Sequence, residues 1–365
     1  MKITFPNLGN SIFPAKAIFD GLGIEYVLPT PSNNEALEIG SFHSPEEICL
    51  PYKIMLGNYI QSIERGADTV IITGSCGPCR YGEYCEMQMN LIKNLGHSLD
   101  FIVIDKPSAI GKKEFMARIT KLVSTSQKSK AKKIRVVLNA YKIVKLIDEI
   151  EMKARYKVGF EINKGQCKDI LKQCKSEALN CKSDIEMVEH LKNYQKIINK
   201  VQINPKKNPI KVAILGEIYT VLEPFSNLYI EDKLMDYGVS TYRGLTTSWW
   251  VKDAVLSPLK LNSIKIRRAS KKYLPLYIGG HARECIGEAV LAEKKGFDGA
   301  IQVYPVGCMP EIVSHAILPT ISKDKNFPIM TLILDEMTGE AGFVTRIEAF
   351  LDLIERRNED VLLGN

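Results

Sequence analysis

The sequence predicts an α/β protein with two open parallel-sheet domains of the flavodoxin or Rossmann type and a basic helical segment between them. Short apolar runs alternate with helical patterns over residues 1–107, in the rhythm of a parallel sheet wrapped by helices. Over residues 108–207 such runs are missing, and Lys, Glu, Leu and Ile recur at spacings of three and four. The α/β rhythm returns over residues 208–365. We therefore expect domain boundaries at 107 and 207.

The N-terminal domain is expected to alternate strands with helices. Its predicted strands are Lys2–Phe5, Ile24–Leu28, Asp68–Thr73 and Asp100–Ile104, and its predicted helices are Phe13–Leu22, Glu46–Arg65 and Arg80–Leu95. Gly23 and Gly66 directly follow the first two helices. Glycine often ends a helix because it adopts a left-handed conformation without strain.

The middle segment is predicted to be mostly helical and is strongly basic. Between Lys106 and Lys211 there are 26 basic and 10 acidic residues, a local charge of +16, while the rest of the chain carries −9. The piece Ser124–Lys133, STSQKSKAKK, is expected to be a solvated loop or a frayed helix end. It lacks the aromatic residues that stack on bases, so a nucleic-acid partner is not expected. Our hypothesis is a docking surface for an acidic partner, which high salt should weaken.

The C-terminal domain is predicted to begin near Pro209. Its strands are expected at Lys211–Leu215, Leu276–Ile278, Gly299–Tyr304 and Pro328–Leu334, with helices at Arg283–Lys295 and Gly342–Arg356. Pro275 marks the start of the second of these strands, because proline cannot donate to a central ladder.

Several functional classes leave no trace in the sequence. No apolar run approaches the eighteen or so residues of a membrane span, and the opening MKITFPNLGNSIF lacks the pattern of a secretory signal. We expect a cytoplasmic protein without a membrane partner. A phosphate-binding loop, a dinucleotide glycine pattern after the first strand and a serine nucleophile elbow are also missing.

Nine cysteines in such a chain are expected to stay reduced, so metal binding or redox chemistry explains them better than disulfides. Cys76 and Cys79 form a C-x-x-C pair in the turn GSCGPCR, just after a predicted strand. Cys308 follows another predicted strand, in YPVGCMPE, and Cys49 lies in SPEEICLPY near a predicted helix start. Ligands of open parallel sheets gather at the carboxyl ends of strands, which is where most of these thiols are expected.

Glycine and proline crowd around three of these thiols. An iron–sulfur cluster needs thiolates that point inward from tight turns and backbone N–H groups free to donate to its sulfurs. The residue types alone also allow zinc, a thiol redox pair or small buried core residues. These alternatives stay open on the pattern alone.

The other cysteines have plainer explanations. Cys85 is expected to be a small helix residue that could serve as a further ligand, and Cys285, in GGHARECIGEA, lies at a helix start. Cys167, Cys174 and Cys181 recur every seven residues, which predicts a packing seam on one helix face. Ligands spaced two turns apart spread over about 20 Å and cannot share one cluster.

Six blocks of sequence resemble the 2-hydroxyacyl-CoA dehydratase superfamily, in particular its D-component-like, activase-related and double-cubane-cluster-like branch. The blocks are PEEICLPYKIMLGNY, GSCGPCRYGEY, GEIYTVLEPFSN, GGHARE, YPVGCMPEIVS and LDEMTGEAGFVTRIEAF, in this order. They cover both predicted α/β domains.

The resemblance implies an oxygen-sensitive iron–sulfur cluster in the cleft between the two α/β domains. Its ligands would be the cysteines at positions Cys49, Cys76 and Cys308, and Cys79 also matches a block of this branch. The resemblance further implies an ATP-hydrolysing iron–sulfur activator as electron donor, a dimeric assembly, and a small-molecule or acyl-CoA substrate. The missing phosphate loop agrees with an activator that is a separate chain.

Removing the heptad trio leaves six cysteines, which would suit either one 4Fe-4S cubane with bystanders or an 8Fe double cubane. We favour one cubane. The leading interpretation is a low-potential reductase or dehydratase-like component, with Glu217, Tyr219 and His281 as candidate polar groups of its pocket. The alternatives are a non-catalytic iron–sulfur carrier or scaffold, in which four thiolates saturate the cluster, and a structural zinc protein.

Overall fold

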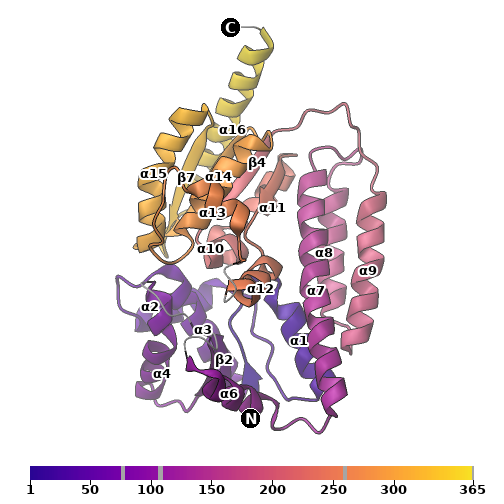
Figure 1. The fold of residues 1–365 in the computed structure, drawn as a ribbon, viewed down its shortest axis with the longest axis vertical. Helices are drawn as coiled ribbons and strands as arrows, with labels where there is room; N and C mark the ends of the chain where they lie inside the picture. The colour runs from indigo at the N-terminus through magenta and orange to yellow at the C-terminus, as the bar shows by residue number, and fades with distance from the viewer. Residues whose placement is uncertain (75–78, 106–109, 258–260, 364–365) are drawn as a thin grey trace. The chain divides into compact units, whose positions relative to one another are not determined.

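The computed structural model describes residues 1–74, 79–105, 110–257 and 261–363, and it confirms the α/β class with two parallel sheets (Figure 1). The chain divides into two compact units. The first comprises Met1–Asp148, Cys174–Tyr194 and Thr247–Asn262, and the second Glu149–Gln173, Gln195–Thr246 and Ser263–Asn365. The division falls inside the helical segment, so its helices contribute to both units. In the described residues, no helix combines the length and apolar character that a bilayer span needs.

The first unit is built on a parallel sheet with strand order β1-β2-β3 in the described residues. Its strands are β1 (Ile3–Thr4), β2 (Thr69–Thr73) and β3 (Asp100–Ile104), and its helices are α1 (Ile12–Leu22), α2 (Asn34–His43), α3 (Leu50–Glu64), α4 (Tyr84–Asn94), α6 (Lys112–Val123) and α12 (Thr247–Leu256), with the 3-10 helices η1 (Gly9–Ser11) and η2 (Arg80–Glu83). The predicted strand Ile24–Leu28 is wrong. Only Tyr26 forms a single bridge, to Ile3.

Helix α3 is fixed in the first unit by an unusually close approach to α2. A Cβ on Gly57 would lie 1.8 Å from the carbonyl oxygen of Ala36, and a Cβ on Gly40 would lie 1.8 Å from that of Lys53. Only glycine allows the two backbones to come this near. The N-terminus of α3, where Cys49 lies, is therefore held by backbone packing along the helix.

The helical segment forms four helices in the described residues, as the spacing predicted. They are α6, α7 (Lys130–Lys157), α8 (Gln166–Ala178) and α9 (Asp184–Lys200). The first turn of α7 includes Lys130 to Lys133, so the predicted loop ends four residues earlier than expected. In the first unit, Asn139 of α7 donates to the carboxylate of Asp184 at 2.7 Å. In the second, the Lys157 ammonium donates to the carbonyl oxygen of Asn199 at 2.9 Å.

The second unit is built on a parallel sheet with strand order β5-β4-β6-β7 in the described residues. Its strands are β4 (Lys211–Gly216), β5 (Ser240–Arg243), β6 (Gly299–Pro305) and β7 (Ile329–Leu334), and its helices are α10 (Ile218–Leu222), α11 (Ile230–Asp236), α13 (Ile264–Ser270), α14 (Ala282–Lys294), α15 (Met309–Lys325) and α16 (Glu340–Leu363), with the 3-10 helix η3 (Phe225–Asn227). Helix α14 packs its buried face against β4 and α15. The predicted strand Leu276–Ile278 is wrong, because Leu276 and Tyr277 are exposed and form no ladder.

Candidate functional site

The thiol of Cys49 lies at the N-terminus of α3. Cys49 is the N-cap residue, with extended backbone (φ −67°, ψ 147°), and Pro51 stands in the first turn, where a missing N–H is tolerated. The helix is buried on all sides from Leu50 to Ser62. The remaining first-turn N–H groups and the helix dipole stabilise negative charge beside them. Cys49 therefore occupies a position that suits a thiolate.

A tyrosine hydroxyl contacts this thiol. The Sγ of Cys49 lies 2.5 Å from the hydroxyl oxygen of Tyr84. The Tyr84 ring packs edge-on against Tyr52, with ring centroids 5.1 Å apart, and lies the same distance from Tyr81. Burial raises the pKa of Tyr52 to about 12, so its phenol stays neutral. The Cys49 thiol thus lies beside a packed group of tyrosines, to which the sequence pattern alone gives no role although Tyr81 and Tyr84 stand in the GSCGPCRYGEY block.

Cys79 lies on a neighbouring turn of the first unit. It is the N-cap residue of η2, again with extended backbone. The Nη1 atom of Arg80 donates to the carbonyl oxygen of Glu47 at 2.8 Å, which links the turn after Cys79 to the turn before Cys49. The fold thus brings these two predicted ligands onto adjacent turns. The third, Cys76, lies outside the described residues.

Cys308 repeats the arrangement of Cys49 in the second unit. It is the N-cap residue of α15, directly after β6, and Pro310 stands in the first turn, so both thiols belong to a Cys-x-Pro helix start. The preceding Gly307 has φ of 74°, which a residue with a side chain rarely adopts. Cys308 is 9% exposed. Each unit therefore offers one cysteine at the N-terminus of a long helix.

A buried polar core lies one helical turn beyond Cys308. Glu311 of α15 is almost fully buried and accepts a hydrogen bond from Nε2 of Gln302 at 2.9 Å. Burial raises the pKa of Glu311 to about 7, and it raises the pKa of the neighbouring Cys285 thiol well above its ordinary value. From Gln302 the hydrogen bonds continue through Thr331, at 3.0 Å, to Nδ1 of His315, at 3.1 Å.

The three predicted pocket residues lie in different local settings of the second unit. The carboxylate of Glu217 caps α10, where it accepts from the backbone N–H groups of Tyr219 (2.9 Å) and Thr220 (2.8 Å). Its charge also contributes to raising the pKa of Glu311, after burial. Tyr219 is buried, and His281 is the half-buried N-cap residue of α14. The roles predicted for them stay predictions.

The remaining cysteines are largely packing residues. Cys167, Cys174 and Cys181 are buried, as the seven-residue spacing predicted, although α8 ends at Ala178, before the third of them. Burial raises the pKa of Cys167 and of Cys174 to about 12. Among residues 1–74, 79–105, 110–257 and 261–363, no three His, Cys, Asp or Glu side chains form a group that could hold a metal ion.

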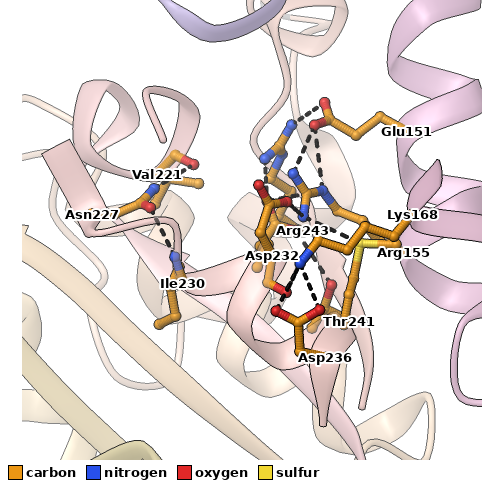
Figure 2. A network of polar contacts seen from close by, with 12 residues as sticks. Glu151, Arg155, Lys168, Val221, Asn227, Ile230, Asp232, Asp236, Thr241 and Arg243 are labelled. Carbon is orange, nitrogen blue, oxygen red and sulfur yellow. Dashed lines mark hydrogen bonds and ion pairs between the residues drawn. The ribbon is translucent and has the colours of Figure 1, made fainter. Parts of the chain in front are cut away.

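Two buried arginines and three carboxylates form an ionic cluster in the second unit (Figure 2). Arg155 of α7 donates to Glu151 at 3.0 Å and to Asp232 of α11 at 2.9 Å. Arg243, at the end of β5, donates to the other Glu151 oxygen at 2.6 Å and also to Glu231. Both arginines and both glutamates are at most 5% exposed.

The charges of this ionic cluster satisfy one another. Although burial opposes its charged form, Glu231 and Glu151 raise the pKa of the Arg155 guanidinium above its ordinary value. At the exposed end of the network, Lys168 of α8 pairs with Asp236 at 2.6 Å. The cluster therefore fixes α7 to α11 and β5, and its three carboxylates leave no net positive charge for an anion.

Comparison with family models matches residues 10–244 to the domain described as "CoA enzyme activase uncharacterised domain (DUF2229)". The matched range includes Cys49 and Cys79 and ends one residue after Arg243 of the ionic cluster. A search of the curated proteins gives no match.

Proposed function

The chain belongs to the CoA enzyme activase uncharacterised domain family, and on this premise we propose that it is an iron–sulfur protein that receives low-potential electrons from an ATP-hydrolysing activator. The proposed ligands are Cys49, Cys79 and Cys308, with Cys76 as a further one. The finer proposal is membership of the D-component-like, double-cubane-like branch of the 2-hydroxyacyl-CoA dehydratase superfamily. There the reaction would be a dehydration or reduction of a small molecule or acyl-CoA.

The observation that carries this proposal is the repeated Cys-x-Pro helix start. Cys49 and Cys308 each occupy the N-cap of a long helix whose first turn contains proline. Iron–sulfur clusters are held by thiolates and tuned by hydrogen bonds to their sulfurs. N-cap thiols next to unbonded first-turn N–H groups supply both features. The donor set therefore fits an iron–sulfur group better than it fits zinc, for which no histidine lies beside these thiols in the sequence.

The neighbouring side chains have definite tasks in this proposal. The hydroxyl of Tyr84 can donate to the Cys49 thiolate and so stabilise its charge. The tyrosine rings around it limit the access of water. The carboxyl of Glu311, with a pKa of about 7, can hold a proton one turn from Cys308. When bound, a cluster would store an electron and, at an iron without a thiolate, would act as a Lewis acid.

A second candidate function is electron transfer without catalysis. It is favoured by Cys79, which lies on the turn next to Cys49 and could supply a fourth thiolate. Four thiolates leave no iron open to a substrate. The two candidates therefore differ in the number of cysteines that the cluster needs.

The test is anaerobic reconstitution with iron and sulfide, followed by visible spectra and iron analysis. We expect Cys49→Ala and Cys308→Ala to lose most of the cluster absorption. Cys174→Ala is the control, because Cys174 is a buried packing residue of α8. It should keep the wild-type iron content, with folding checked by circular dichroism. Equal iron content in all three variants would sink the assignment, and retention of iron in Cys79→Ala would favour catalysis over a saturated carrier cluster.

A further inference from the structure

The N-terminal half of α7 exposes an apolar stripe, which consists of Ile134, Val137, Leu138 and Tyr141. These side chains are between 42% and 62% exposed. Their spacing of three and four residues places them on one face of the helix. The opposite face is core, with Val136 completely buried against α1. The helix is thus amphipathic on one side and carries apolar groups in solvent on the other.

Only positive charges surround this stripe. Residues 130–147 contain six basic and no acidic residues. On the helical wheel, Lys130 and Lys145 continue the stripe at its two ends, and Arg135 and Lys142 flank it. Of the described ion pairs, none involves Lys130, Arg135 or Lys142. The cations are therefore available to carboxylates of another molecule.

We propose that this α7 stripe is the docking surface for an acidic protein partner that presents an apolar strip between carboxylates. The inference deepens the proposed function, because the partner it describes is the chain's electron donor. Charge complementarity steers such encounters and sets their partner choice, while the apolar centre holds the complex together. Weak electron-transfer complexes bury less than about 1,200 Å² in total, which suits a stripe of four side chains.

Two other occupants fit this face less well. A second copy of the chain would bring two sets of six positive charges together, and a standard stable interface needs about 800 Å² from each partner. A membrane-surface helix inserts a broad apolar face rich in Trp, Phe or Leu. The α7 stripe is narrow, contains neither Trp nor Phe, and belongs to a helix whose other face is fixed in the core.

The test measures binding of a fluorescent acidic peptide to the full metal-free chain. The peptide is a stapled helix with leucine at the a and d heptad positions and glutamate elsewhere. We expect Val137→Asp to weaken binding by at least about tenfold, since it places a carboxylate within an apolar contact that faces glutamates. Val255→Asp is the matched control, because Val255 is an equally exposed valine on α12. Likewise Lys142→Glu should weaken binding more than Lys192→Glu, an exposed position on α9.

Several results would overturn the proposal. Equal binding by Val137→Asp and Val255→Asp would remove the stripe from the interface. Binding to anionic phospholipid vesicles but not to the peptide would assign the face to a membrane, and a dimer that Val137→Asp dissociates would assign it to a second copy. The readout needs no iron, so failure here and failure of the iron–sulfur proposal are separate results.

Discussion

Replacing Glu311 by glutamine tests whether a proton is stored in the buried polar core beside Cys308. The Glu311 carboxyl is 1% exposed, and burial raises its pKa from 4.5 to about 7. The native state therefore keeps the proton up to a higher pH than the unfolded chain does. The free energy of unfolding should then fall as pH rises from about 4.5 to 7 and level off above that range.

The magnitude follows from the size of the pKa difference. A shift of about 2.5 units corresponds to about 3 kcal/mol, at about 1.4 kcal/mol for each unit. Glutamine has nearly the same shape and does not titrate. Any constant effect of the amide appears equally at both pH values, so the change between them isolates the charge. Cys285 does not interfere, because burial keeps its thiol protonated at pH 8.

The assay is urea unfolding of the metal-free chain under reducing conditions at pH 5 and pH 8, followed by circular dichroism. We expect the stability advantage of Glu311→Gln over wild type to be about 3 kcal/mol larger at pH 8 than at pH 5. The matched control is Glu355→Gln on the exposed side of α16, which should show a small and similar change at both. An advantage that is the same at both pH values would refute a stored proton at Glu311.

Two further predictions concern stability, and urea unfolding measures both. Arg155→Met leaves buried carboxylates with one arginine in place of two and should cost about 3 kcal/mol or more, whereas Lys168→Met, at the exposed end of the same network, should cost about 1 kcal/mol or less. Equal losses would mean that the ionic cluster does not hold α7 to the second sheet. Gly57→Ala forces α3 away from the Ala36 carbonyl and should cost at least about 1–3 kcal/mol. A wild-type free energy of unfolding there would contradict the close packing of α2 on α3.

The buried strands could be predicted from sequence because each is a run of β-branched residues. The strand Asp100–Ile104 forms with the expected bounds, and the ranges of β2, β4, β6 and β7 differ by only a residue or so. Leu276–Ile278 has the same composition but stays in solvent, since three residues do not determine burial. The strand β5, STYR, was missed because it is short and polar and lies at the sheet edge. Its Arg243 is buried only because it meets carboxylates from distant parts of the chain.

The candidate site was predictable in its residue types and not in its surroundings. Proline two residues after Cys49 and Cys308 is visible in the sequence and becomes a helix start in both units. The contact between Cys49 and Tyr84 joins residues 35 apart, and the pair Glu151 and Arg243 joins residues 92 apart. Such pairs depend on tertiary packing, which local periodicity does not encode.

The most direct test of the central proposal is the iron and acid-labile sulfide content of the chain purified without oxygen. We expect about four irons and four sulfides per chain, with a visible spectrum that partly bleaches on reduction by dithionite. About eight irons would extend the proposal to a double cubane. Zinc in place of iron, or no metal after anaerobic purification and reconstitution, would contradict it.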